Sequence, residues 1–234
     1  MPYQAYLIAG IPVLLAIIFA VYAGAKVRSV FAQCSNIRPQ SGMTGYDAAR
    51  RVLNENGLSH VRIERIAGSM TDHFDPRSNT VRLSETVYGI SSAAAVGVAA
   101  HEAGHAIQYA RRYFPLKLRN AIIPVTNIGS RLSTPLILLG IILAAASYVF
   151  IYVAYAGLLC FGFSVLFQLL TLPTEFNASK RALKAIQNSE ILTPEETAAT
   201  KRVLSAAAMT YVAATLVAFT QFMRLFLLIN NRRR

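Results

Sequence analysis

The sequence predicts a mainly α-helical integral membrane protein, a bundle of about four apolar helices plus a small α+β domain with a short antiparallel sheet. The composition supports this, because hydrophobic residues make up 54% of the 234 residues and charged residues only 15%, with a mean hydropathy of +0.42. Uncharged runs of about 20 residues or more recur, which is the length that a helix needs to cross a bilayer. Between the first two runs lies a more polar stretch in which two segments alternate polar and apolar residues, the pattern of β-strands.

The basic residues flank the apolar runs and do not form one patch. The net charge is +12, but pairs such as Arg111–Arg112 and Lys180–Arg181 lie at the borders of apolar segments. This arrangement is typical of a protein that faces anionic lipid and not of one that binds nucleic acid. The excess of Lys and Arg predicts that segments 26–131 and 180–202 lie in the cytoplasm. If the last apolar helix crosses the membrane, the basic tail 232–234 ends outside, so either that helix does not span or the orientation is reversed.

Residues 1–33 are predicted to form an N-terminal membrane anchor. The segment Ala5–Ala25 has no charged residue and is long enough to cross a bilayer as a helix. A secretory signal peptide is the competing interpretation, because Ala23-Gly24-Ala25 is typical of a cleavage site. The residues before the apolar segment include no Lys or Arg, whereas signal peptides begin with a basic region, so an uncleaved anchor is favoured.

Residues 34–131 are predicted to form the polar-to-mixed domain. Thr44 and Asp47 match a capping box that begins a helix. Two alternating segments, 61–66 and 79–83, predict two strands joined by a turn. Because the strands are only about ten residues apart, we expect them to pair as an antiparallel hairpin or meander.

The next predicted helix runs from Ala93 to about Arg112, with Ser91 or Ser92 as its cap. Its first half consists almost entirely of small residues, which favours close helix packing and a place at the centre of the domain. Its second half contains His101-Glu102-Ala103-Gly104-His105, the most distinctive pattern in the chain. Two histidines four residues apart share one face of a helix and can bind one zinc ion, while the glutamate can act on a water molecule at the metal.

Residues 132–173 are predicted to form a transmembrane helical hairpin. The segment Leu132–Pro173 contains no charged residue. As a single helix it would be about 63 Å long, which is twice the thickness of a bilayer. We therefore expect two spans, 134–152 and 153–172, joined by a tight turn.

Residues 174–234 are predicted to contain two helices. The first, 174–188, is basic and amphipathic. Thr193 and Glu196 match a capping box that begins the second helix, which is apolar over 203–222.

A catalytic zinc site needs a third protein ligand besides His101 and His105, because such sites use three ligands and leave the fourth position open to water. The remaining candidates are few, among them His73 in the turn between the strands and Glu175 just after Pro173. Glu175 is preferred, because a proline at the membrane exit would fix the start of a helix there. A carboxylate at a helix start also compensates the helix dipole, so the residues alone leave both interpretations open.

Several separate stretches carry a resemblance to a known family. They are Ala100–Gln108, Thr71–Pro76, Val81–Ser84, Arg119, Pro124, Gly129-Ser130 and Pro173–Ser179. These stretches resemble the YugP-type bacterial membrane zinc metallopeptidases, also called neutral zinc metallopeptidases, and the resemblance covers nearly the whole chain. That family in turn resembles the HtpX-type gluzincins, in which a glutamate on a later helix is the third zinc ligand and a strand beside the active-site helix holds substrate.

The resemblance implies a zincin-like domain over 34–131 and one zinc ion (Zn²⁺) per chain, bound by His101, His105 and Glu175. The implied substrate strand consists of Asn79, Thr80, Val81, Arg82 and Leu83. The chain departs from the HtpX-type pattern at Ser179, where that pattern has an acidic residue, and from many YugP-type proteins at Asn177, where they have Asp. We therefore expect the carboxylate that orients a zinc-bound histidine to be missing or replaced by a neutral group.

The resemblance further implies a zinc metalloendopeptidase of gluzincin type, in which Glu102 is the general base for a zinc-activated water. His73 and Tyr211 are candidates for stabilising the oxyanion, although a structural role in its turn is the alternative for His73. Glu175 follows Leu172, the end of a predicted span, so we expect the zinc to lie near the membrane face. This placement favours membrane proteins or membrane-adjacent segments as substrates.

The expected location is the bacterial cytoplasmic membrane, with several spans and with the catalytic domain facing the cytoplasm. The alternative function is a non-catalytic membrane scaffold or adaptor with a structural zinc site, which requires four protein ligands, with His73 as the natural fourth. The sequence leaves open whether the chain forms a homo-oligomer or has a regulatory partner in the membrane.

Overall fold

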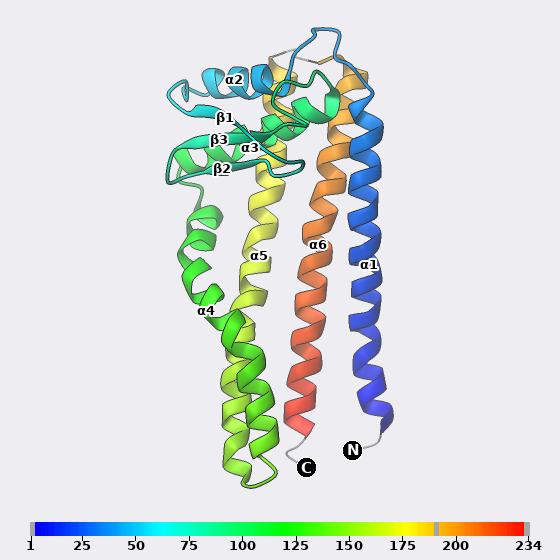
Figure 1. Cartoon of the computed structure of the whole chain (residues 1–234), viewed down its shortest axis with the longest axis vertical. Helices are drawn as coiled ribbons and strands as arrows, with labels where there is room; N and C mark the ends of the chain where they lie inside the picture. Colours follow the sequence, from blue (N-terminus) through cyan, green and yellow to red (C-terminus); the bar gives the residue numbers. More distant parts are fainter. Residues whose placement is uncertain (1–2, 190–191, 232–234) are drawn as a thin grey trace. The chain divides into compact units, whose positions relative to one another are not determined.

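The computed structural model describes residues 3–189 and 192–231, which form six α-helices, one 3-10 helix and a three-stranded sheet. In chain order these are α1 (Tyr3–Ser35), α2 (Gly45–Glu55), β1 (Arg62–Ile66), β2 (His73–Asp75), β3 (Thr80–Ser84), α3 (Ala93–Ala110), α4 (Phe114–Leu143), η1 (Tyr148–Phe150), α5 (Ile151–Asn188) and α6 (Pro194–Asn230) (Figure 1). The chain divides into two compact units. Unit 1 comprises Met1–Tyr22, Leu118–Leu172 and Thr210–Arg234, and unit 2 comprises Ala23–Lys117 and Pro173–Met209.

Four helices of the described residues are long and apolar enough to cross a membrane. They are Ala9–Ser35, Phe114–Leu143, Tyr148–Asn188 and Pro194–Asn230. Large apolar side chains on these helices are exposed, for example Val21 and Leu159, each at 67%. Exposure of this kind is unfavourable in water and costs nothing in lipid. The predicted mainly α-helical membrane fold with four long apolar helices is therefore confirmed.

The hairpin of unit 1 is formed by α4 and α5, which are joined by η1 and the turn before it. Small residues allow the two helices to approach closely, because a Cβ on Gly129 would lie 2.9 Å from the carbonyl oxygen of Cys160 and one on Gly157 would lie 2.8 Å from that of Ser133.

The predicted bounds of the two spans, 134–152 and 153–172, are wrong. The first helix begins at Phe114 and ends at Leu143, and the second begins at Ile151. The basic residues and prolines before residue 132 resembled a border in the sequence, but α4 runs through them, with Pro124 and Pro135 inside the helix.

The small sheet of unit 2 is mixed, with strand order β1-β3-β2. β1 and β3 run parallel in the register Arg62↔Thr80, so the expected antiparallel pairing of these two strands is wrong. The segment between them contains the third strand, β2, which pairs antiparallel with β3 at its other side. The chain therefore reverses twice between β1 and β3, and this returns β3 to the direction of β1.

Three predicted helix starts of unit 2 are confirmed, those of α2, α3 and α6. Thr44 and Asp47 form the capping box of α2, and Ser92 caps α3 by accepting the backbone N–H of Ala95. The N–H of Glu196 donates to Thr193 Oγ1, and Glu196 Oε2 accepts the N–H of Thr193, which begins α6. Each cap satisfies backbone donors that the first turn of a helix leaves without an intrahelical partner.

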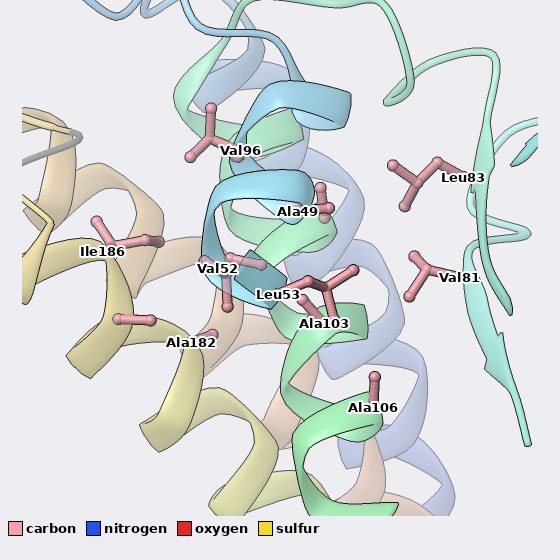
Figure 2. Close-up of a cluster of buried hydrophobic side chains, with 14 of the residues drawn as sticks. Ala49, Val52, Leu53, Val81, Leu83, Val96, Ala103, Ala106, Ala182 and Ile186 are labelled. Carbon is pink, nitrogen blue, oxygen red and sulfur yellow. The ribbon is translucent and has the colours of Figure 1, made fainter. Parts of the chain in front are cut away.

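The core of unit 2 holds α3 between α2, the sheet and the second half of α5. Figure 2 shows this cluster, which includes Ala49, Val52, Leu53, Val81, Leu83, Val96, Ala103, Ala106, Ala182 and Ile186. Burying a side chain such as Leu53 or Ile186 stabilises the fold by about 1.5–3 kcal/mol. The small residues that α3 contributes allow its neighbours to pack close to its backbone. The histidine motif thus lies on a helix of which most residues are buried.

Candidate metal centre

His101 and His105 lie one turn apart on α3, and their imidazole rings face each other edge-on. The ring centroids are 4.7 Å apart with an interplanar angle of 87°. Both side chains are 13% exposed. They are therefore largely buried, but part of each imidazole ring still contacts solvent. This arrangement follows from the helical repeat, which places residues i and i+4 on the same face.

Glu175 of α5 completes a group of three potential metal ligands with these histidines. Its Oε2 atom lies 3.3 Å from His101 Nε2 and 3.4 Å from His105 Nε2. Zinc bonds to nitrogen and carboxylate oxygen at about 2.0–2.2 Å, so two ligands in a tetrahedral site lie about 3.3–3.5 Å apart. The three ligand atoms lie within 4.8 Å of one another, and no other His, Cys, Asp or Glu of the described residues joins the group. Their chemistry and spacing therefore fit a zinc ion with one position left open.

Gly104, between the two histidines, allows α5 to approach α3. A Cβ at this position would lie 2.7 Å from the carbonyl oxygen of Ala178 and 3.4 Å from its Cα. The two helix backbones are consequently in direct contact at the level of the histidines. This contact lets the short side chain of Glu175 reach both Nε2 atoms.

Glu175 lies inside a continuous helix and not at a helix start. α5 runs from Ile151 to Asn188 without interruption and includes Pro173. The expected start of a new helix at 174 is therefore wrong, and compensation of a helix dipole does not explain Glu175. Its contacts with the two histidines are the remaining explanation for a carboxylate that is only 4% exposed.

The electrostatics of the group favour a bound cation. Burial alone lowers the pKa of His105, but the hydrogen bond to Glu175 and the negative charge of Glu102 outweigh it, so the pKa stands above its usual range. Glu102 itself is 8% exposed. Two carboxylates beside two imidazoles thus attract positive charge, which a metal ion supplies.

A second layer of polar side chains contacts the Nδ1 atoms of the two histidines. Ser179 Oγ lies 3.1 Å from His101 Nδ1. Gln108 Oε1 lies 3.0 Å from His105 Nδ1, and Gln108 Nε2 donates to Asn177 Oδ1. Asn177 and Ser179 were singled out in the sequence, whereas Gln108 was not. The spacing of Gln108 could have indicated its position, because a residue three positions after His105 lies on the same face of the helix.

His73 and Tyr211 remain candidates for the oxyanion only as predictions. His73 is exposed on β2, and its Nδ1 donates to the Thr71 carbonyl oxygen at 2.8 Å. Among the described residues it is not part of the metal-ligand group. Tyr211 belongs to unit 1, whereas the three ligands belong to unit 2.

The implied substrate strand, residues 79–83, falls on β3, the central strand of the sheet. β3 is paired along its full length with β1 and over Thr80–Arg82 with β2. Its backbone hydrogen-bonding groups are therefore occupied on both sides there, and the role of this strand in substrate binding stays a prediction.

Comparison with known proteins identifies the family. A family model described as "Putative neutral zinc metallopeptidase" matches residues 9–230. The chain belongs to the neutral zinc metallopeptidase family. It is 42% identical over 212 residues to "Putative membrane protease YugP" of Bacillus subtilis, an alignment that covers 91% of this chain and 92% of the relative. No solved structure matches the chain.

Membership in the family confirms two predictions. The first is the resemblance to YugP-type proteins, and the second is zinc as the cofactor, for which the described residues provide the group His101, His105 and Glu175.

Proposed function

We propose that the protein is a membrane-embedded zinc endopeptidase of gluzincin type that cleaves membrane proteins or membrane-adjacent segments. The observation that carries the proposal is the approach of Glu175 Oε2 to the Nε2 atoms of both motif histidines, at 3.3 and 3.4 Å. A glutamate from a later helix that joins two histidines of a His-Glu-x-x-His helix leaves one position open on the metal, as catalytic sites require.

Glu102 is the proposed general base. His101, His105 and Glu175 would hold a zinc ion, which would act as a Lewis acid on the carbonyl group and would lower the pKa of a water molecule to about 7. Glu102 takes a proton from the attacking water and passes it to the nitrogen of the leaving group. Its position next to His101 on the rigid helix α3 and its low exposure support this role.

The free edge of the sheet suits an extended peptide. Within the described residues β2 pairs with a strand on one side only, and it packs on α3 through Phe74, whose ring centroid is 5.7 Å from that of Tyr109. A peptide that adds a strand here would form backbone hydrogen bonds beside the metal-bearing helix. Residues 79–83 would then act through side chains, since the backbone of β3 is already paired at 80–82.

The position of Glu175 along α5 supports substrates at the membrane. Glu175 follows Leu172 by three residues on one helix, which corresponds to about 4.5 Å along the helix axis. The proposed location is the bacterial cytoplasmic membrane, with the metal centre facing the cytoplasm, because the segments that carry it are rich in Lys and Arg.

A scaffold with a structural zinc site finds no support in the geometry. Such a site uses four protein ligands, and the group within residues 3–189 and 192–231 contains three. The buried Glu102 also has no function in a structural site.

The experiment compares the full-length wild type with Glu102→Gln in proteoliposomes. Cleavage of a quenched fluorescent peptide library should fall by about 10²- to 10⁴-fold in the variant, while zinc content, measured by mass spectrometry, stays equal to that of the wild type. Membrane proteomes of cells expressing either form should then differ in the natural substrates. Unchanged cleavage by the variant would overturn the role of Glu102, and absence of cleavage by the zinc-loaded wild type would overturn the proposed function.

A further inference from the structure

We infer that Gln108, oriented by Asn177 and Arg181, is a positioning residue that fixes the tautomer of His105 so that its Nε2 lone pair faces the metal. The inference rests on His105 as a zinc ligand, which is part of the proposed site, and not on the reaction. It depends on one chain of hydrogen bonds whose directions can each be assigned.

The chain of hydrogen bonds begins at Arg181. Its Nε lies 2.7 Å from the side-chain amide of Asn177, and its guanidinium lies 6.0 Å from the centroid of the Tyr113 ring. A guanidinium can only donate hydrogen bonds, so the Asn177 atom that faces it must be the carbonyl oxygen, Oδ1. Arg181 therefore determines which way the Asn177 amide points.

Gln108 takes its orientation from two acceptors. Its Nε2 lies 3.0 Å from Asn177 Oδ1 and 2.7 Å from the backbone carbonyl oxygen of Thr174. Both of these atoms can only accept, so the Gln108 atom between them must be the NH₂ group, and both of its hydrogens are used. The two bonds lead independently to the same orientation. The remaining amide atom, Oε1, must then face His105.

His105 is left with one choice of tautomer. Gln108 Oε1 lies 3.0 Å from His105 Nδ1 and offers only lone pairs, so Nδ1 must carry a hydrogen. In the neutral ring Nε2 is then unprotonated, and this is the atom that lies 3.4 Å from Glu175 Oε2. A metal ion bound beside Glu175 would take the lone pair of Nε2, and the hydrogen bond from Nδ1 to Gln108 favours this orientation of the ring.

His101 lacks such a constraint, which makes the two ligands unequal. Its Nδ1 contacts the hydroxyl of Ser179, a group that can donate or accept, so this contact imposes no tautomer. Gln108 is 0% exposed, so water does not compete for its amide. In many other zinc sites a carboxylate accepts the N–H of the zinc-bound histidine and orients its ring. Here the neutral amide of Gln108, oriented through Asn177 by Arg181, accepts the N–H of His105.

The test uses the full-length protein in detergent micelles, with zinc affinity from chelator competition and histidine tautomers from ¹⁵N NMR of the zinc-free protein at a pH at which the imidazole rings are neutral. The chain contains only four histidines, which makes their assignment by substitution practical. Gln108→Met keeps the length of the side chain and removes its acceptor. We expect it to weaken zinc binding about 10- to 100-fold and to give a mixture of His105 tautomers.

The matched variants at position 177 separate positioning from packing. Asn177→Asp keeps an acceptor for Arg181 and for Gln108, so zinc affinity should stay within about threefold of the wild type. Asn177→Leu has nearly the same size but no acceptor, so both the affinity and the single tautomer should be lost. Equal behaviour of these two variants, or a single His105 tautomer in Gln108→Met, would overturn the inference.

A further variant, His105→Ala, shows whether a negative result concerns only the role of Gln108 or the proposed zinc site as a whole. If His105→Ala binds zinc as the wild type does, His105 is not a ligand and the proposed site is wrong. If His105→Ala loses zinc while Gln108→Met retains full affinity, the site stands and only the role of Gln108 is wrong.

Discussion

Gly104 packs so closely against Ala178 that a methyl group at position 104 would lie 2.7 Å from the Ala178 carbonyl oxygen. Contacts this short do not occur, so a side chain here must push α5 away from α3. The possible metal-binding group lies on both helices, with His101 and His105 on α3 and Glu175 on α5. The distance between these two backbones therefore controls the geometry of the metal group.

Gly104→Ala should weaken zinc binding by at least about tenfold and lower the melting temperature. Overpacking in a tight contact costs about 1–3 kcal/mol, whereas Ala within a helix is favoured over Gly by about 1 kcal/mol. A net loss would show that the close approach outweighs helix propensity. Chelator competition and thermal unfolding measure the two effects.

Gly89→Ala is the matched control for this substitution. It lies in the same unit, and a Cβ there would meet no atom within 4 Å. Its zinc affinity should equal that of the wild type. If Gly104→Ala behaves in the same way as this control, α5 does not need the glycine in order to reach the histidines.

Glu175→Ala should remove zinc under conditions in which the wild type holds one ion per chain. The side chain contributes one of three ligands and is 4% exposed, so water replaces it poorly. Mass spectrometry of the metal content after dialysis measures the loss. Glu195→Gln, which changes an exposed carboxylate in the first turn of α6, should retain full zinc occupancy. Equal zinc content in both variants would contradict the ligand role of Glu175.

Removal of zinc should lower the melting temperature, and zinc added back should restore it. A ligand that binds only the native state at 100 times its dissociation constant stabilises that state by about 2.7 kcal/mol. Glu102→Gln should show the same response, because Glu102 is not part of the ligand group. Glu175→Ala should show little response. A wild type that melts at the same temperature with and without chelator would argue against a metal that joins α3 to α5.

Acid should weaken the turn between β2 and β3 through Asp75. The hydrogen bond from Arg82, at 2.8 Å, together with those from Ser78 and the Arg77 backbone, holds the pKa of Asp75 well below its usual range. A carboxyl group with a lowered folded-state pKa stabilises the fold above its unfolded pKa of about 3.9 and loses this effect as the pH falls below it.

Asp75→Asn isolates this contribution. The melting temperature of the variant should be lower than that of the wild type at pH 6, and the difference should shrink as the pH falls below about 4. A difference that stays constant over this interval would mean that the Asp75 charge contributes nothing to the turn.

Local signals allowed three helix starts and two members of the possible metal-binding group to be recognised in the sequence. The capping pairs Thr44–Asp47 and Thr193–Glu196 act within four residues, as does the spacing of His101 and His105, so each can be recognised without tertiary information. Glu175 could not be singled out in this way, because composition allowed a helix start there. Its position after Pro173 made it the preferred candidate but left both interpretations open, and the resemblance to a family favoured the ligand.

The sequence-based predictions were wrong or incomplete where contacts between distant residues determine the structure. The parallel pairing of β1 and β3 depends on the short strand His73–Asp75, which has too few residues to show alternation. The border of α4 was misplaced because a helix in a membrane protein can contain prolines and basic residues. The spacing of Gln108 from His105 placed it on the face of the histidines, but its contacts with Thr174 and Asn177 of α5 could not be predicted from the sequence.

The order in which the ligands are synthesised has a consequence for the newly made protein. His101, Glu102 and His105 leave the ribosome well before Glu175, which follows all of α4 and the apolar part of α5. Two histidines alone do not make the three-ligand site of a zinc hydrolase. Until α5 has been synthesised, the chain thus lacks the carboxylate of the group His101, His105 and Glu175, so a metal ion bound by all three residues would join the complete α4–α5 hairpin to α3.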